Sequence, residues 1–284
     1  MIWGDYSLED GVRKSVCLDD LLNIHLKGNG SELWLAYDRN RELPPDINDE
    51  DDADHDGGAD DDEGQASSDD TDHDVHTIDE NQWTRWRLRS AKPVISLSPA
   101  FPNLPFVVHP EHNYQLAPGA ETRLFMRIPV AVTVADKTDN NLRLTEINAV
   151  ELVKTWFGTF ESGEVCYWVK TVASLKVRPE MVRAHRCYCP VLIRNESDDF
   201  LHIEKICLRV ERLSIFEKNG MLWSDQMRVV HKGGDNFSDL TVDGRPPAEA
   251  EGATLLTRPR NPVREGIALR TFKALNQLPV INMF

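Results

Sequence analysis

The chain has 284 residues, of which 40% are hydrophobic, and a formal net charge of −15 at pH 7. This length and apolar content suit one large folded domain or two smaller ones, and no apolar run approaches the ~20 residues that a membrane-spanning helix needs. The opening residues MIWGDYSLEDG are acidic where a signal peptide is basic and then apolar. We therefore expect a cytoplasmic protein with no direct membrane insertion.

The negative charge is concentrated in one segment. Of 47 acidic residues, seventeen lie between Asp46 and Glu80, where there is no Lys or Arg. Outside this segment 30 acids remain against 32 bases, so the rest of the chain is close to neutral. A body without a basic excess, joined to a segment that repels phosphates, argues against nucleic acid as a partner.

The chain has five cysteines, an odd number, scattered mostly through apolar runs, and we expect free buried thiols in a reducing compartment. His185, Cys187 and Cys189 alternate along a predicted strand, which would place three soft ligands on one face. Structural zinc sites usually show C-x2-C spacing and need a fourth ligand. We therefore interpret this run as a buried face of small side chains.

Alternating apolar and polar residues predict β-strands in the N-terminal region. The alternation runs through Leu22–Leu26 and resumes at Leu33–Tyr37, with turn residues at Gly28–Ser31 between them, which predicts a hairpin. Gly11–Leu18 is expected to be a third strand. Strand-like sequence returns at Gln82–Arg89, so we expect the acidic segment to leave and re-enter one β region.

The acidic segment itself, residues 46–80, is composed largely of Asp, Gly, Ser and His. It cannot bury enough apolar surface to offset the entropy of ordering, so we expect a disordered insertion. One stretch matches the calcium-loop pattern D-x-D-x-D-G-x5-E, although Pro44 and Pro45 stand where an entering helix would be. We expect weak Ca²⁺ binding at most and no other cofactor; the candidate ligands are Asp52, Asp54, Asp56, Asp60 and Glu63.

The sequence pattern also predicts β-strands in the second half of the chain. A proline-rich passage, Lys92–Pro110, marks the expected subdomain boundary, and Thr122–Val134 predicts a long strand in which Pro129 indicates an edge position or a bulge. Lys218–Gly220 predicts a hairpin turn. Only the tail, Arg264–Leu278, has helical spacing of its apolar residues.

These elements predict a mainly β protein with one or two β-sandwich, immunoglobulin-like units, a long disordered acidic insertion and a C-terminal helix. Four parts are expected: an N-terminal β region, the acidic insertion, a β-sandwich region, and a C-terminal helix with its tail. Their ranges are 1–45 with 81–100, 46–80, 101–260, and 261–284.

Three arginines, Arg85, Arg87 and Arg89, are candidate binding residues on one strand face. They would hold an anionic ligand or a phosphate backbone, or be covered by the acidic segment. We favour a third interpretation, an ordinary solvated face with Trp86 and Leu88 pointing into the core.

A second candidate group surrounds an expected hairpin loop, and loops on rigid β scaffolds often carry recognition. The alternative is that Trp156 and Phe157 fill the end of the sandwich. The group combines charge, hydroxyls and an aromatic ring: Lys154, Thr155, Trp156, Ser162 and Glu164.

Two pairs of sequence runs resemble a known family. They are LVKTWFG (152–158) with SGEVCY (162–167), and CPVLIRN (189–195) with KICLRVE (205–211). With the opening MIWG, they resemble the prokaryotic family called domain of unknown function 432 over nearly the whole chain except the acidic segment. The resemblance implies no established activity and no catalytic residues. Through channel genes that neighbour the family's genes, it implies a component of a mechanosensitive membrane channel as a partner.

The sequence contains no P-loop, G-x-G-x-x-G, G-x-S-x-G or H-E-x-x-H motif, so an enzyme is the less favoured hypothesis. The leading hypothesis is a non-catalytic cytoplasmic β-sandwich module that binds a protein partner, with the acidic loop as an electrostatic or cation-responsive element. One alternative is an enzyme or small-molecule binder with a pocket near Lys154, Trp156 and Glu164. The other is a Ca²⁺-regulated module.

Overall fold

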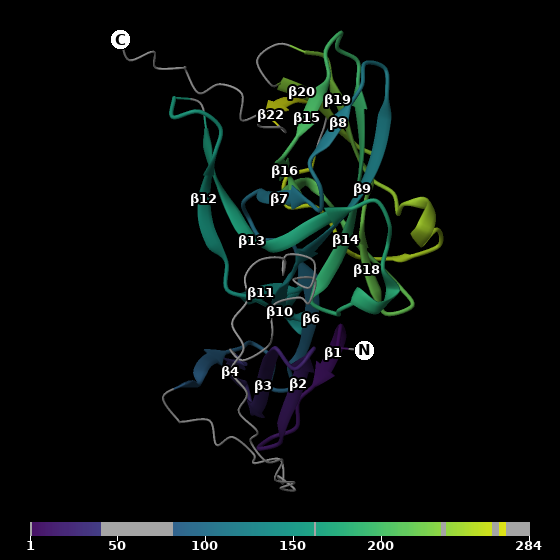
Figure 1. Cartoon of the computed structure of the whole chain (residues 1–284). Coiled ribbons are helices and arrows are strands. Elements are labelled where there is room, and N and C mark those ends of the chain that lie inside the picture. The colour runs from purple at the N-terminus through teal and green to yellow at the C-terminus, as the bar shows by residue number, and fades with distance from the viewer. Residues whose placement is uncertain (1, 41–81, 162, 234–236, 263–266, 271–284) are drawn as a thin grey trace, which may run out of the picture.

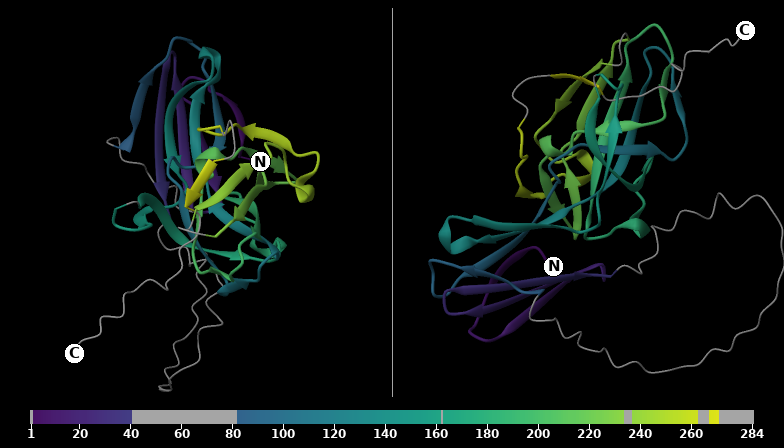
Figure 2. Two further views of the ribbon diagram at one scale, coloured as in Figure 1. Left: turned by 90° about the horizontal axis from the view of Figure 1, so that it is seen from above. Right: turned by 90° about the vertical axis from the view of Figure 1, so that its left-hand side faces the viewer.

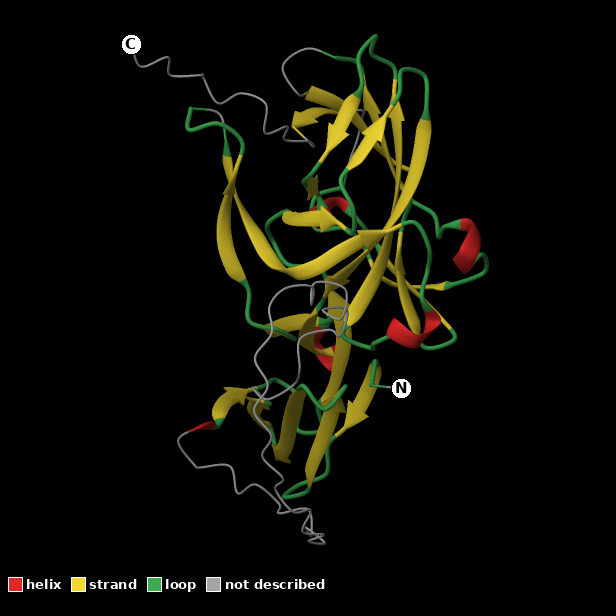
Figure 3. Ribbon diagram, in the orientation of Figure 1, coloured by secondary structure: helices red, strands yellow, loops and turns green. Residues whose placement is uncertain are grey.

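The computed structural model describes residues 2–40, 82–161, 163–233, 237–262 and 267–270. These residues form strands joined by turns and short 3-10 helices (Figures 1 and 3). Two regions lie one above the other in Figure 1, each with its own apolar core. The mainly β fold class is confirmed. The expected acidic insertion, residues 46–80, lies outside the described residues.

The N-terminal region is a sandwich of two four-stranded antiparallel sheets. Apolar side chains at alternate strand positions fill the space between them, for example Ile24 from one sheet and Ile95 from the other. The first sheet contains β2 (Arg13–Leu18), β3 (Leu22–Asn29), β4 (Glu32–Arg39) and β5 (Thr84–Arg87), and the second β1 (Gly4–Ser7), β6 (Val94–Ala100), β10 (Ala131–Asp136) and β11 (Leu142–Asn148), with the 3-10 helix η2 (Lys137–Asp139) after β10.

The hairpin and third strand expected at the N-terminus are confirmed as β3, β4 and β2. β4 also pairs directly with β5. Residues 41–81 therefore join neighbouring strands of one sheet, as the sequence predicted. The Lys218–Gly220 turn is confirmed too, since Asn219 and Gly220 both have positive φ values (54° and 82°) between two paired strands.

The C-terminal region is a twelve-stranded mixed sheet that bends around the second core, together with a separate two-stranded pair. The sheet contains β7 (Phe106–Pro110), β9 (Glu121–Pro129), β12 (Val153–Phe157), β13 (Glu164–Ser174), β14 (Arg186–Asn195), β16 (Ile206–Leu208), β17 (Ile215–Lys218), β18 (Met221–Ser224), β19 (Met227–His231), β20 (Phe237–Val242), β21 (Thr254–Thr257) and β22 (Ile267–Arg270). The pair is β8 (Tyr114–Leu116) with β15 (Leu201–Ile203), and the 3-10 helices are η3 (Pro179–Met181), η4 (Val210–Arg212) and η5 (Ala248–Ala250).

The chain passes between the two regions at Val130, which differs from the expected division. The predicted long strand is split, because β9 ends at Pro129 and β10 starts at Ala131 in the other region. Proline has no N–H to continue a ladder, and the Val130 N–H donates instead to the carbonyl of His185 (2.9 Å). Residues 131–148 therefore complete the N-terminal sandwich, although the expected boundary placed them within 101–260.

The expected C-terminal helix is not supported. Residues 267–270 form β22, which pairs antiparallel with β20. The exposed edge of β20 offers backbone hydrogen bonds, and such tertiary pairing overrides a local helical pattern. Residues 271–284 lie outside the described residues.

Several hydrogen bonds join the two regions, and one group of them lies at the turn between β2 and β3. The Asp19 carboxylate accepts from the His185 backbone N–H (2.7 Å) and from the ring Nδ1 (2.6 Å), and His185 is only 7% exposed. Burial acts to raise the pKa of Asp19. The hydrogen bonds from His185 outweigh it, so the pKa lies below its ordinary value. The contact therefore stabilises the fold when Asp19 is ionised.

We expect Asp19→Asn to lower the free energy of unfolding by about 1–2 kcal/mol near neutral pH, because a charged acceptor of two hydrogen bonds is lost. The folded pKa is depressed, so this stabilisation is full above the unfolded pKa of about 3.9 and is lost as the pH falls through the folded value. Urea unfolding of both proteins at several pH values measures it. A difference between the two proteins that does not shrink as the pH is lowered below the unfolded pKa would contradict the assignment.

Candidate functional site

A β-hairpin reaches away from the C-terminal region, and we call it the arm (residues 153–168) (Figures 1 and 2). It consists of β12 and the first part of β13, which pair antiparallel with Trp156 opposite Val165. Among the described residues β12 pairs only with β13, so its outer edge has no strand neighbour there. The hairpin expected around Trp156 is confirmed.

The arm presents large apolar side chains to solvent. Phe160 in its turn is 96% exposed and Trp156 is 51% exposed. The Trp156 Nε1–H donates to the carbonyl of Thr159 (3.0 Å), and Gly163 lies so close to the indole that a Cβ there would overlap it. These contacts hold the indole in place while half of it stays in water. Further exposed apolar side chains of the arm are Val153, Val165 and Trp168.

The other face of the arm is anchored in the body. Phe157 is 2% exposed and packs with Cys166, Val107 and Cys207 in a small apolar cluster. Successive residues of a strand point to opposite faces, so the burial of Phe157 turns Trp156 outward. The alternative in which both aromatic side chains fill the end of the sandwich is therefore wrong for Trp156.

An ion pair adjoins this cluster, with its arginine buried and its carboxylate partly exposed. The Arg209 guanidinium donates to both carboxylate oxygens of Glu164, and the Arg209 side chain is only 5% exposed. Burial acts to lower the pKa of Arg209, but Glu164 more than offsets it, and the pKa lies above its ordinary value. A bidentate pair fixes orientation as well as charge. It therefore holds Glu164, the first residue of β13, in one position.

The residues predicted around the loop lie on the arm but do not enclose a pocket. Lys154 and Trp156 share one face of the hairpin, whereas Thr155 and Glu164 belong to the other. Ser162 lies outside the described residues. The geometry thus offers no support for a pocket bounded by Lys154, Trp156 and Glu164.

The predicted arginines face solvent around β5, and Trp86 and Leu88 contact the core instead. The preferred interpretation of a solvated strand face therefore fits, and each arginine has a neighbour of its own. The contacts are Arg85 above the Trp34 ring (3.8 Å to its centroid), Arg87 with Glu32 (3.3 Å) and Arg89 with Asp139 (3.3 Å).

The same sandwich carries a Ser–His–Asp set that sequence analysis missed. Ser15 Oγ lies 2.8 Å from Nδ1 of His25, and Asp38 Oδ2 lies 2.9 Å from its Nε2. Its residue types are those of a hydrolase triad, although with the two ring nitrogens exchanged, since in a triad Ser contacts Nε2 and Asp contacts Nδ1. However, Arg13 Nη2 is 2.8 Å from the same Nδ1, and its charge opposes the imidazolium that a general base must form. We interpret the set as a hydrogen-bond network that joins β2, β3 and β4. The sequence did not predict it, because its residues lie on three different strands and form no local motif.

The predicted Ca²⁺ ligands, Asp52, Asp54, Asp56, Asp60 and Glu63, all lie outside the described residues. Within the described part of the chain, no group of three or more His, Cys, Asp or Glu is arranged to hold a metal ion. Cys187 and Cys189 are buried in the core. No helix in the same ranges is long and apolar enough to cross a bilayer.

A model of the family described as "Protein of unknown function (DUF432)" matches residues 2–276. The chain belongs to this family. The match covers the sandwich, the C-terminal region and the arm, and it confirms the resemblance seen in the sequence. No curated protein and no solved structure matches this DUF432 member, so its function has to be argued from its own geometry.

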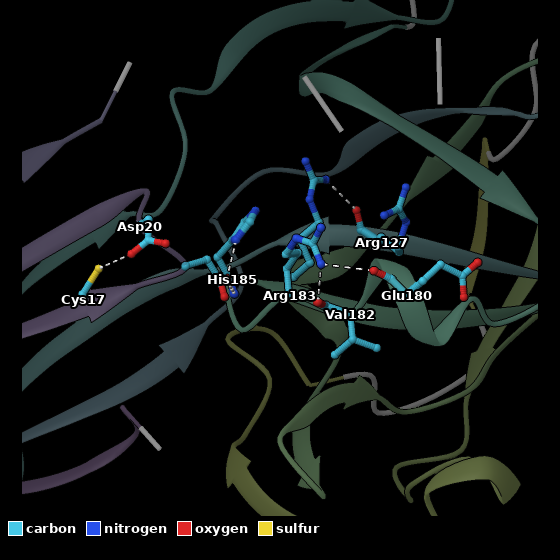
Figure 4. Close-up of polar contacts among 9 residues, drawn as sticks. Cys17, Asp20, Arg127, Glu180, Val182, Arg183 and His185 are labelled. Atoms are coloured by element: carbon cyan, nitrogen blue, oxygen red, sulfur yellow. Dashed lines mark hydrogen bonds and ion pairs between the residues drawn. The ribbon is translucent and has the colours of Figure 1, made fainter. Parts of the chain in front are cut away.

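This DUF432 member also has a basic cluster near the junction of its two regions, which sequence analysis missed. The connection from β13 to β14 brings its cations close to Arg127 of β9 (Figure 4). Arg183 bends back to donate to the carbonyls of Glu180 (3.2 Å) and Val182 (2.9 Å). A signal was available in the sequence, since four Lys or Arg residues lie between Lys176 and Arg186 against one acid.

Two phenylalanines of the arm provide a matched test of its anchoring. Phe157→Ala should lower the free energy of unfolding by about 3–5 kcal/mol, because it empties a buried site. Phe160→Ala should change it by no more than about 0.5 kcal/mol, because that ring is solvated. Denaturant unfolding monitored by circular dichroism measures both. Equal effects of the two substitutions would refute the assignment of a buried and an exposed face.

Proposed function

We propose that this protein is a non-catalytic module that binds a protein partner through the arm. The observation that carries the proposal is the exposure of Phe160 and Trp156 on a projecting hairpin that Phe157, next to its turn, anchors to the body. Aromatic side chains are enriched at the centres of protein interfaces, where their burial dominates affinity. A solvated strand surface needs no such cluster.

The backbone of the arm adds a second binding element. The open edge of β12 presents N–H and C=O groups that a partner strand can pair with, and a partner that adds a strand there also reaches the row of Lys154 and Trp156. The fixed position of Trp156 lowers the entropy cost of association. Together these features favour an extended segment with an apolar surface as the partner.

The proposal places the module in the cytoplasm. It is supported by the five cysteines, all free thiols and four of them buried, which is usual in a reducing compartment. A membrane-channel component as the partner, and an electrostatic or cation-responsive role for the acidic segment, stay predictions.

Site-specific photo-crosslinking in living cells tests the proposal. A photoreactive phenylalanine analogue at Phe160 should give a discrete adduct with one protein. The matched control places the same analogue at Phe200, which is also exposed (58%) but lies outside the arm, and should give no such adduct. Adding Trp156→Ala to the Phe160 protein should abolish the adduct.

The captured protein is then purified and its affinity measured directly. Trp156→Ala should weaken binding by at least about 2 kcal/mol if the indole is a central contact. Identical adduct patterns from positions 160 and 200, or an affinity that Trp156→Ala leaves unchanged, would reject the arm as the binding surface.

A further inference from the structure

A small hollow lies beside the junction, between β9, β13, β14 and the connection that carries η3. Seven described residues line it; three of them are basic and none is acidic. The lining residues are Arg127, Val172, Ser174, Lys176, Arg178, Met181 and Tyr188. A concave surface lined by three cations and no carboxylate has the composition of an anion site.

The basic groups are held in place by their surroundings. Arg127 is 6% exposed, and its carbonyl accepts from Thr171 Oγ1 (2.8 Å) and from Arg186 Nη1 (3.2 Å). These bonds fix the backbone of Arg127, and burial restricts its side chain, so ordering the side chain around a ligand costs little entropy.

Hydroxyl groups of the wall fix the other two basic residues. Ser174 Oγ donates to the carbonyl of Lys176 (2.8 Å), and the Tyr188 hydroxyl donates to the carbonyl of Arg178 (2.9 Å). The backbone of Lys176 and of Arg178 is therefore held against the wall of the hollow.

Two acidic side chains lie near the hollow without lining it. Glu111 accepts from Arg178, and Glu180 is exposed on η3 beside Arg183. Arg186, 7% exposed, adds another cation behind Arg127. The local charge is therefore positive, although the chain as a whole carries −15.

The size of the hollow limits its ligand. It offers only about 10 Å³ to the centre of a water-sized group, and it opens to solvent. This space admits one oxygen atom of a ligand, so a small oxyanion would enter with one oxygen only. We infer that this hollow binds a small oxyanion, either inorganic phosphate or the terminal phosphate of a small molecule.

Calorimetric titration of the full chain with inorganic phosphate tests the inference, at an ionic strength kept constant with chloride. Saturable binding is expected. Lys176→Gln and Arg127→Gln should each weaken it about tenfold, the loss expected for one charge-assisted hydrogen bond. Lys92→Gln removes one exposed charge elsewhere and should bind phosphate like the wild type. Because Arg127 is buried, circular dichroism must show that its variant is folded; Lys176 is exposed and its variant carries the test alone if Arg127→Gln unfolds.

A parallel titration with glycerol 3-phosphate distinguishes the two sources of the anion. Tighter binding than that of inorganic phosphate would assign the site to the end group of a larger molecule, and equal or weaker binding would assign it to the free ion. Heat that does not saturate with either ligand, or affinities that are the same in the wild type, Lys176→Gln and Arg127→Gln, would overturn the inference.

Discussion

The ion pair between Arg209 and Glu164 is the contact on which the arm depends. It lies on the same face of the hairpin as Phe157, because Glu164 stands opposite Phe157 in the register of β12 and β13. Removing one partner of a buried pair leaves an uncompensated charge, a cost reduced here by the 40% exposure of the Glu164 side chain. Once this face is buried, strand alternation leaves Trp156 and Val165 no direction except outward. The exposure of Trp156 and Val165 thus follows from how the arm is anchored, whereas Val153 and Trp168 are exposed on the anchored face, at the end of the hairpin away from its turn.

One strand links the arm to the basic hollow. β13 starts at Glu164, in the arm, and ends at Ser174, in the wall of the hollow. At about 3.3 Å per residue, these two points are roughly 30 Å apart. Along this length β13 pairs in turn with β12, β7 and β9, so it is held from both sides by the body of the protein. The proposed protein-binding surface and the proposed oxyanion site therefore rest on a single continuous element.

The local sequence pattern predicted those strands and turns whose residues have regularly alternating burial or positive φ values. It did not predict features that depend on pairing between strands far apart in the sequence. The alternation in β3 and β4 and the turn at Asn219 were readable, because half-buried strands and positive-φ turns leave marks in the sequence. The split at Val130 was not readable, since β10 changes sheets to pair with β6. Arg209 belongs to the run KICLRVE (205–211) that resembles the family, yet only the fold shows that its side chain contacts Glu164. Arg127 joins the basic connection for the same reason, through the pairing of β9 with β14.

The most direct test of this account is amide hydrogen exchange of the arm in the wild type and in Arg209→Met. If the arm is a preformed surface held through Phe157 and Glu164, the paired amides of β12 and of residues 164–168 should be protected in the wild type. In Arg209→Met they should exchange faster, while the amides of β9 and β14 keep their rates. Arm amides that already exchange at the rate of an unstructured chain in the wild type would contradict it.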